Sequence, residues 1–445
     1  MKLNAKLDVD VLALQEDDEV TCLLRFDAPI PDGLADRPGE TLVVVVDRSG
    51  SMSGEPIEAV RASLHALAGR VKPQDNFGVV VFDNEASVAV PCRPIRDHHL
   101  PTVHGLIDGI DPGGSTDLSG GYLLGLAEAR RNLGATGATV LLLSDGHANA
   151  GVTDPVAVGG LAAKARDERI TSGTIGIGHG YDEILLAEIA SSGNGSHRFA
   201  LTADDAEATV GEEAGDLLSK AIVNAMVRIK PTDPAHIDRI GLLHDVRRWL
   251  EEDASGEKVI VVPLGDLYAG EQRELLVKFD VPAIAALGHH VLAEFSIEYV
   301  ALPGLESEVI TWPMAVNVVP GDEASGRVPD PTVTTARLLL EAANAKKQAA
   351  DELRHGDVDG AVAMLRLQSE HITGALRAID DDAPEADALR ALLAEEAEQV
   401  ERLTRGAQEM PAAMVAKSMT EDWTNQARGR NDVDRKRRNR GKRDF

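Results

Sequence analysis

The sequence is poor in cysteine, and no long apolar run interrupts it. Cys22 and Cys92 are the only cysteines among 445 residues, too few for a disulfide framework or a cysteine-rich zinc site. The longest apolar runs have the length of a strand, which excludes a membrane-spanning helix. Residues 1–20 have no apolar core of the kind that a secretory signal requires. Together these absences predict a reduced, cytoplasmic protein.

Positive charge is scarce over most of the chain. The sequence has 45 Lys and Arg residues against 73 Asp and Glu residues, which gives a net charge of −28. Such a surface repels nucleic acid and anionic membranes, so neither is expected as a partner. The exception is the stretch 428–443, with nine basic and two acidic residues. We predict that residues 409–445 form a disordered basic tail, either simply solvated or a tether for an acidic partner.

Two hydrophobic patterns divide residues 1–320. Residues 1–39 and 226–320 alternate with a period of two, which is typical of antiparallel strands with one buried face. Residues 40–225 instead contain apolar runs such as LVVVV separated by amphipathic helices, which predicts a parallel sheet covered on both faces. Because a segment as short as 1–39 buries little surface alone, we expect both flanks to form one β-sandwich. The predicted fold is therefore a doubly wound α/β domain inserted in an antiparallel β-sandwich.

An α-helical region is predicted to follow the sandwich. Residues 321–332 are rich in Pro, Gly and acidic residues and have the composition of a linker. Residues 333–408 contain three stretches of helical periodicity. The first two are separated by the short turn HGDVDG (355–360), and short connections make antiparallel neighbours. A three-helix region of the hairpin type is therefore expected.

Oxygen-bearing side chains stand where strands of the predicted parallel sheet end. Asp47, Ser49 and Ser51 alternate directly after the buried run LVVVV. Thr116 lies in a loop before a predicted helix, and Asp145 follows the apolar run TVLLL. Ligand sites of parallel sheets lie at the carboxyl ends of strands, so these groups are expected to meet at one edge. Carboxylates and hydroxyls suit Mg²⁺, Mn²⁺ or Ca²⁺ rather than zinc or copper.

This set of residues resembles the metal-ion-dependent adhesion site of the von Willebrand factor type A domain, and the resemblance extends over residues 40–225. It implies that Ser49, Ser51 and Thr116 bind the metal directly or nearly so. It also implies that Asp47 and Asp145 act through water and hold the ligands in place. The family binds and scaffolds proteins, so the resemblance implies a metal, Mg²⁺ in the first place, that accepts an Asp or Glu side chain of a partner protein.

We therefore predict a metal-dependent scaffold or adaptor that is not an enzyme, with no catalytic residue and no organic cofactor. One alternative is a metal-dependent phosphohydrolase of the haloacid dehalogenase type, which would use Asp47 as its nucleophile. That chemistry needs a second acid two residues later, where Ser49 cannot serve as an acid or base. Another alternative is a structural subunit whose metal only stabilises the fold. Asp47 on its own is also consistent with a cap of the next helix.

Overall fold

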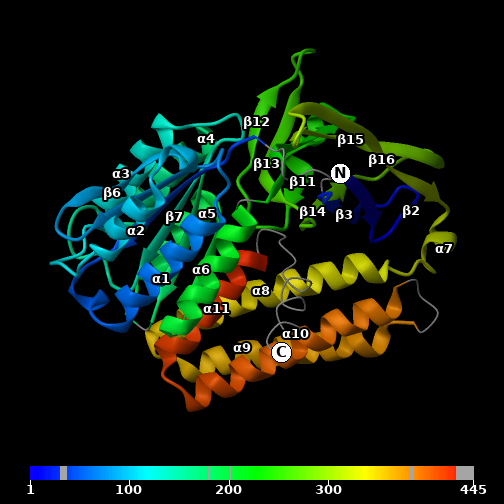
Figure 1. The fold of residues 1–445 in the computed structure, drawn as a ribbon. Helices are drawn as coiled ribbons and strands as arrows, with labels where there is room; N and C mark the ends of the chain where they lie inside the picture. The colour runs from blue at the N-terminus through cyan, green and yellow to red at the C-terminus, as the bar shows by residue number, and fades with distance from the viewer. Residues whose placement is uncertain (31–37, 179, 201, 218, 381–384, 427–445) are drawn as a thin grey trace. The chain divides into compact units, whose positions relative to one another are not determined.

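The computed structural model describes residues 1–30, 38–178, 180–200, 202–217, 219–380 and 385–426 (Figure 1). The chain divides into two compact units, one formed by Asp32–Lys220 and the other by Met1–Pro31 together with Ala221–Phe445. The first unit contains a mostly parallel sheet, and the second contains two further sheets and a group of helices. The segments on either side of the first unit therefore fold together, although they are far apart in the sequence.

The first unit is a six-stranded sheet with helices on both faces. Its strands are β4 (Thr41–Asp47), β5 (Asn76–Phe82), β6 (Ala86–Pro94), β7 (Ala138–Ser144), β8 (Ile170–Ile177) and β9 (Asn194–Ala200). Its helices are α1 (Glu55–Arg70), α2 (Leu100–Asp108), α3 (Leu118–Arg131), α4 (Pro155–Asp167), α5 (Glu183–Ser192) and α6 (Ala203–Leu217). The strand order is β6-β5-β4-β7-β8-β9, and all neighbours are parallel except β6, which runs antiparallel to β5. The predicted doubly wound, mostly parallel sheet is therefore confirmed, and only the edge strand β6 was not foreseen.

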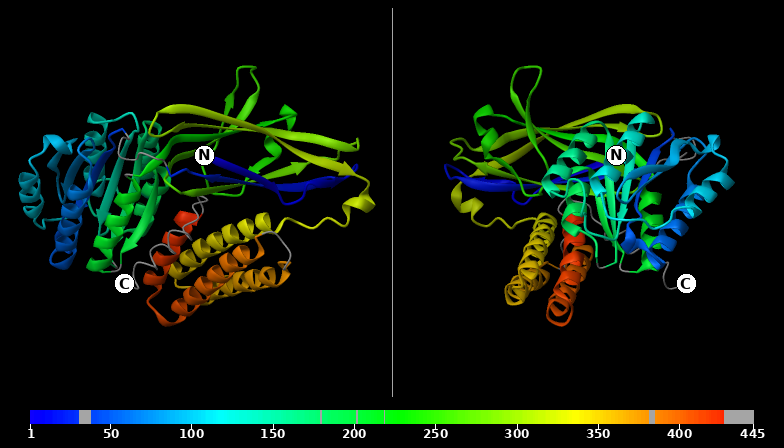
Figure 2. Two further views of the ribbon diagram at one scale, coloured as in Figure 1. Left: turned by 45° about the vertical axis from the view of Figure 1, so that its right-hand side comes forward. Right: turned by 90° about the vertical axis from the view of Figure 1, so that its left-hand side faces the viewer.

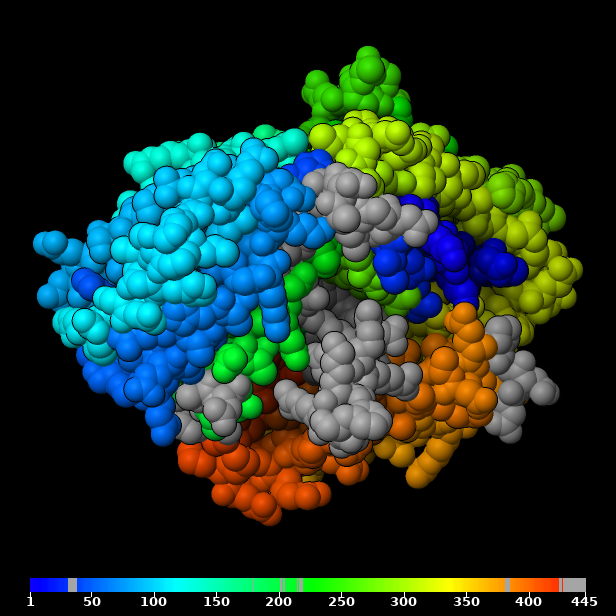
Figure 3. All heavy atoms as spheres, in the orientation of Figure 1, coloured from blue at the N-terminus to red at the C-terminus, as the bar shows by residue number. Residues whose placement is uncertain are grey.

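The central strands are apolar along their length because helices cover them from both sides. Every residue of β4 and β7 is buried. Helices α3, α4 and α5 pack on one face, and α1, α2 and α6 lie on the other (Figures 1 and 2). In the space-filling view, residues of α1 and α2 form the surface over that second face (Figure 3). Asp117, Asp154 and Asp182 start α3, α4 and α5 by accepting hydrogen bonds from first-turn N–H groups.

The second unit begins with a β-sandwich built from the segments that precede and follow the first unit in the sequence. One sheet contains, in order, β1 (Lys2–Leu7), β3 (Asp18–Asp27), β14 (Gln272–Val281) and β11 (Ile240–Leu242). The other contains β12 (Trp249–Glu252), β13 (Lys258–Tyr268), β10 (Lys220–Pro231), β15 (Gly288–Ala301), β16 (Glu306–Val319) and β2 (Val11–Ala13). Strand β3 pairs with β14 along its whole length, and both sheets contribute to one apolar core. The flanks therefore form a single sandwich, as predicted, although β2 pairs with β16 in parallel.

Residues 221–225 belong to the sandwich and not, as the predicted range 40–225 has it, to the α/β domain. They lie in β10, which pairs with β15. Ala221, Ile222 and Ala225 are fully buried in the sandwich core. Small and branched apolar residues are compatible with a helix or a strand. Here they form a strand because they pair with β15.

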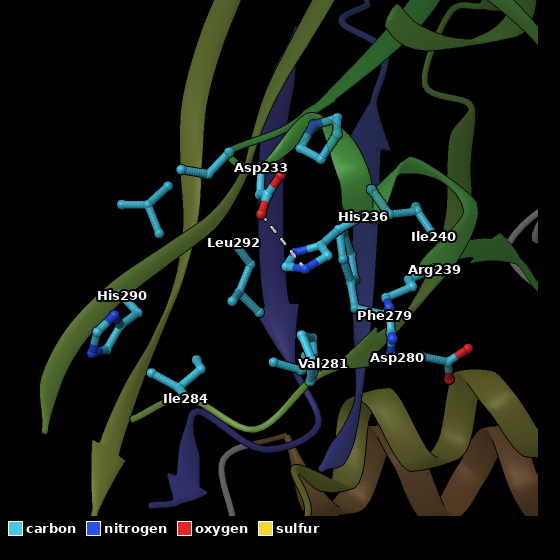
Figure 4. Close-up of a pocket in the computed structure, with 14 residues that line it drawn as sticks. Asp233, His236, Arg239, Ile240, Phe279, Asp280, Val281, Ile284, His290 and Leu292 are labelled. Atoms are coloured by element: carbon cyan, nitrogen blue, oxygen red, sulfur yellow. Dashed lines mark ion pairs between the residues drawn. The ribbon is translucent and has the colours of Figure 1, made fainter. Parts of the chain in front are cut away.

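A cavity of about 170 Å³ opens in the sandwich beside the short helix η4 (Pro234–Arg239) (Figure 4). Its apolar lining includes Val281, Ile284 and Leu292. His236 of η4 points toward this lining, and its Nε2 lies 3.7 Å from Oδ2 of Asp233 (Figure 4). The alternating pattern of the strands did not predict this cavity, because it depends on how η4 packs against them.

The sandwich is followed by helices α7 (Gly321–Ala324), α8 (Pro331–His355), α9 (Val358–Ala378), α10 (Ala386–Glu409) and α11 (Ala412–Gln426). Helices α8 to α11 share one apolar core. The predicted linker 321–332 is thus partly helical, because it contains α7 and the start of α8, which the Asp330 carboxylate caps. None of the described helices is long and apolar enough to cross a membrane.

The prediction of a disordered tail over residues 409–445 is wrong for residues 412–426. These residues form α11, which packs against α8. Val415, Ala416 and Met419 are buried in the shared core, and their spacing gives α11 an apolar side. The charge change near the C-terminus obscured this short pattern. The basic run 428–443 lies outside the described residues, and its disorder stays a prediction.

A buried ion pair joins three of these helices. Lys346 of α8 is completely buried, and its Nζ lies 2.7 Å from Oε1 of Glu396 in α10. Gln426 of α11 donates a hydrogen bond from Nε2 to Glu396 Oε2, at 3.2 Å. Its Oε1 accepts one from Lys346 Nζ, at 3.4 Å. The pair therefore fixes how α8, α10 and α11 meet.

We expect Lys346→Ala to destabilise the helical region, because it leaves the Glu396 carboxylate buried without its cation. The free energy of unfolding should fall by about 3–5 kcal/mol. The double variant Lys346→Met/Glu396→Leu removes both charges and should lose much less. Urea denaturation followed by circular dichroism measures both. Equal losses in the single and double variants would contradict this role of the pair.

Candidate metal centre

The structure brings the five predicted metal-site residues to one edge of the α/β sheet. Asp47 is the last residue of β4, and Ser49 and Ser51 lie in the turn that leads to α1. Thr116 precedes the N-cap of α3, and Asp145 directly follows β7. Because β4 and β7 are parallel neighbours, their carboxyl ends lie side by side. All five except Ser51 are buried, and the exposed Ser51 connects the site to solvent.

Hydrogen bonds link the hydroxyls and carboxylates of the site directly. Ser51 Oγ donates to Asp145 Oδ1 at 2.8 Å, and the hydroxyl oxygens of Ser49 and Ser51 lie 3.1 Å apart. Asp47 Oδ1 accepts from the Ser49 backbone N–H at 2.8 Å, and Oδ2 accepts from Ser144 Oγ at 2.7 Å. The carboxylate of Asp47 therefore holds the turn between β4 and α1. The hydroxyls of Ser49 and Ser51 face each other, and that of Ser51 faces Asp145.

Three hydroxyl oxygens converge on one point beside Gly146. A Cβ atom built on Gly146 would lie 3.3 Å from Ser51 Oγ, 3.8 Å from Thr116 Oγ1 and 4.0 Å from Ser49 Oγ. Glycine at this position therefore leaves open the space that the hydroxyls surround. Oxygen atoms arranged in this way are a donor set for a hard divalent cation.

The loop that carries Thr116 is held by its neighbours on two sides. Asn149 Oδ1 accepts from the Thr116 backbone N–H at 2.8 Å, and the Thr116 carbonyl accepts from the N–H groups of Asn149 and Ala150. On the other side, a Cβ on Gly113 would lie 1.9 Å from Asp83 Oδ2. The Asp83 carboxylate is in turn paired with Arg48, whose Nη2 lies 3.1 Å away. These contacts fix where the Thr116 hydroxyl stands.

Sequence reasoning missed the supporting residues of the site. Ser144 and Gly146 flank Asp145 in the run Ser-Asp-Gly, so their neighbourhood was visible in the sequence. Asn149 and Asp83 had no such signal, because they reach the Thr116 loop only when the chain has folded. Among the described residues, no group of three or more His, Cys, Asp or Glu residues is arranged to hold a metal. A metal at this edge therefore depends on hydroxyl oxygens.

The two carboxylates of the site are buried, which disfavours their negative charge. Burial is the main cause that raises the pKa of Asp47, against the lowering effect of hydrogen bonds from Ser144 and Ser49. Burial also raises the pKa of Asp145 to about 6; the hydrogen bond from Ser51 opposes this shift and the charge of Asp47 adds to it. Within the described part of the chain, neither carboxylate forms an ion pair with a basic side chain. A bound cation would offset this charge.

The comparisons with known proteins concern the domain and its fold. Residues 41–213 match the family model of the von Willebrand factor type A domain. The fold is similar to that of a solved von Willebrand factor type A protein from Catenulispora acidiphila, with a TM-score of 0.72 and 14% identity, over 96% of this chain and 97% of that chain. At this identity the likeness concerns the fold alone. The chain thus contains a von Willebrand factor type A domain, as the motif predicted.

Two curated relatives extend the match in sequence. YfbK of Escherichia coli (strain K12) is 28% identical over 264 residues, which is 58% of this chain and 45% of that protein. The E3 ubiquitin-protein ligase WAV3 of Arabidopsis thaliana is 26% identical over 383 residues, which is 83% of this chain and 46% of that protein. The chain thus spans less than half the length of either relative. The ligase activity that the name of WAV3 states is a property of that protein.

We expect Gly113→Ala to destabilise the domain by about 1–3 kcal/mol, because the new methyl group displaces the Asp83 carboxylate from Arg48. Gly160→Ala in α4 is the matched control, since a Cβ there meets nothing within 4 Å. Alanine in a helix interior should leave stability unchanged or raise it slightly. Thermal unfolding of both variants tests the difference. A Gly113→Ala variant as stable as the control would contradict the close packing of this loop.

Proposed function

We propose that the centre holds a divalent cation, Mg²⁺ in the first place, and that the cation accepts an Asp or Glu side chain of a partner protein. Ser49, Ser51 and Thr116 would supply oxygen ligands, and Asp47 and Asp145 would hold them and supply negative charge. The observation that carries this proposal is the convergence of three hydroxyls on the open space at Gly146. Among the described residues the two buried carboxylates have no basic ion-pair partner, and a cation would neutralise their charge.

The donor set supports Mg²⁺, with Mn²⁺ and Ca²⁺ as alternatives, because hard cations prefer oxygen ligands. Neutral hydroxyls donate less charge than carboxylates, so a cation held by them stays attractive to an outside carboxylate. Von Willebrand factor type A domains mediate protein–protein interactions. We therefore infer a scaffold or adaptor that does not turn over a substrate. A cytoplasmic location, and an acidic partner for the basic stretch 428–443, belong to the same proposal.

The first test is direct binding of a divalent cation, with Mn²⁺ as the probe because its electron paramagnetic resonance signal reports binding. Thr116→Ala removes one converging hydroxyl and should weaken Mn²⁺ binding at least about tenfold, which corresponds to about 1.4 kcal/mol. Gly146→Ala should weaken it as well, because the methyl group enters the space between the hydroxyls.

Ser115→Ala is the matched control for this test. Ser115 stands next to Thr116 in the same loop, but its hydroxyl is exposed and bonds to Asn84. The Ser115→Ala variant should bind Mn²⁺ as the parent protein does. In both proteins, excess Mg²⁺ should displace the Mn²⁺ probe. Equal affinities of the Thr116→Ala and Ser115→Ala variants would rule out the proposed ligand set.

The second test asks whether a partner needs the metal. Affinity capture from the native lysate is run with Mg²⁺ and with EDTA, using the parent chain, Thr116→Ala and Ser115→Ala. A partner lost with EDTA and with Thr116→Ala, but retained by Ser115→Ala, is the expected result. A partner retained in every arm would contradict metal-bridged binding. If EDTA then lowered only the melting temperature, the metal would be purely structural. Hydrolysis of a generic phosphomonoester with Mg²⁺ would instead favour the phosphohydrolase alternative.

A further inference from the structure

Two histidines and an aspartate form a cluster between α1 and α2, apart from the residues of the metal centre described above. Nδ1 of His65 in α1 lies 2.5 Å from Nδ1 of His104 in α2. The two rings are 4.8 Å apart between centroids and tilted by 30°. On the other side of the same ring, His65 Nε2 lies 2.8 Å from Oδ1 of Asp108. Three side chains from two helices therefore meet around one imidazole. Only the two histidines can be ligands here, since the described residues hold no group of three His, Cys, Asp or Glu ligands.

The Asp108 carboxylate determines which nitrogen of His65 is available. A carboxylate accepts a hydrogen bond, so the proton of a neutral His65 ring resides on Nε2. The lone pair of this ring is then on Nδ1, which faces His104. Metal-binding histidines commonly donate their other ring N–H to a carboxylate in this way, and this fixes the ring and makes it a better ligand. His104 and Asp108 are one helical turn apart, so α2 presents both toward α1.

We propose that His65 and His104 bind a borderline transition-metal cation of the Zn²⁺, Cu²⁺ or Ni²⁺ class through their Nδ1 atoms, with Asp108 orienting His65. Imidazole nitrogen suits this class, whereas oxygen donors suit Mg²⁺ and Ca²⁺. Two nitrogens on one tetrahedral zinc ion are about 3.4 Å apart, since each Zn–N bond is about 2.1 Å long. The rings would have to separate by about 1 Å from their present hydrogen-bonded distance.

The surroundings of the cluster allow a cation to enter. The side chains of His65 and Asp108 are 29% and 69% exposed. The cluster is therefore reached from solvent, and water would complete the coordination. A cation bound there would also link α1 to α2.

Copper titration with electron paramagnetic resonance tests the proposal on the full chain. The titration is run in millimolar Mg²⁺, which occupies oxygen sites and leaves nitrogen sites free. We expect a Cu²⁺ species with nitrogen hyperfine coupling that disappears in His65→Ala and His104→Ala. Asp108→Asn should keep the nitrogen coupling but weaken Cu²⁺ binding by about ten- to a hundredfold. Thr116→Ala, which alters only the first centre, should leave this species unchanged.

His99→Ala is the matched control, because His99 is an exposed histidine at the N-cap of the same helix and bonds to Thr102. The His99→Ala variant should bind Cu²⁺ as the parent chain does. Melting temperatures without metal check that the variants are folded, and Zn²⁺ should raise the melting temperature of the parent chain but not of His104→Ala. The proposal is overturned if the His65→Ala/His104→Ala double variant retains the same nitrogen-coupled species, or if the parent chain shows none.

Discussion

The buried carboxylate of Asp47 is the constraint on which the edge of the α/β sheet depends. A charge removed from water is costly unless hydrogen bonds and a counter-charge compensate it. Asp47 accepts one hydrogen bond from Ser144 at the end of β7 and another from the Ser49 backbone, so it joins two strand ends and the turn between β4 and α1. The same bonds aim the hydroxyls of that turn at β7. In the part of the chain that the structure describes, no basic side chain pairs with Asp47, so a cation at this edge would compensate its charge.

Two glycines, which have no side chain, shape this edge as much as the polar side chains do. Gly146 leaves open the space between three hydroxyls, and Gly113 lets the Asp83 carboxylate approach the loop backbone. Asp83, which follows β5, then reaches Arg48, the residue after Asp47. The ion pair thus joins the turns after β4 and β5, and the loop before α3 packs against it. The position of Thr116 thus follows from this packing together with the backbone hydrogen bonds to Asn149 and Ala150.

The two proposed cation sites differ in donor chemistry. The first uses hydroxyl and carboxylate oxygens from three segments, one of which is the turn that leads into α1, and the second uses the imidazoles of His65 in α1 and His104 in α2. Hard and borderline cations would therefore not compete for the same ligands. Because α1 begins at Glu55, shortly after Ser51, a cation that links α1 to α2 would act on the helix that follows the turn with Ser49 and Ser51.

The sequence by itself determined the class of the fold and the outline of the site. The apolar run before Asp47 requires a strand covered on both faces, and parallel strands bring their carboxyl ends together, so Asp47, Ser49, Ser51, Thr116 and Asp145 were placed at one edge. The tertiary structure alone decided the contacts of Asn149 and Asp83 with the Thr116 loop, the helix at 412–426 and the meeting of His65 with His104. Periodicity records which face of an element is buried, but not which distant element covers it; that depends on packing between segments remote in the chain.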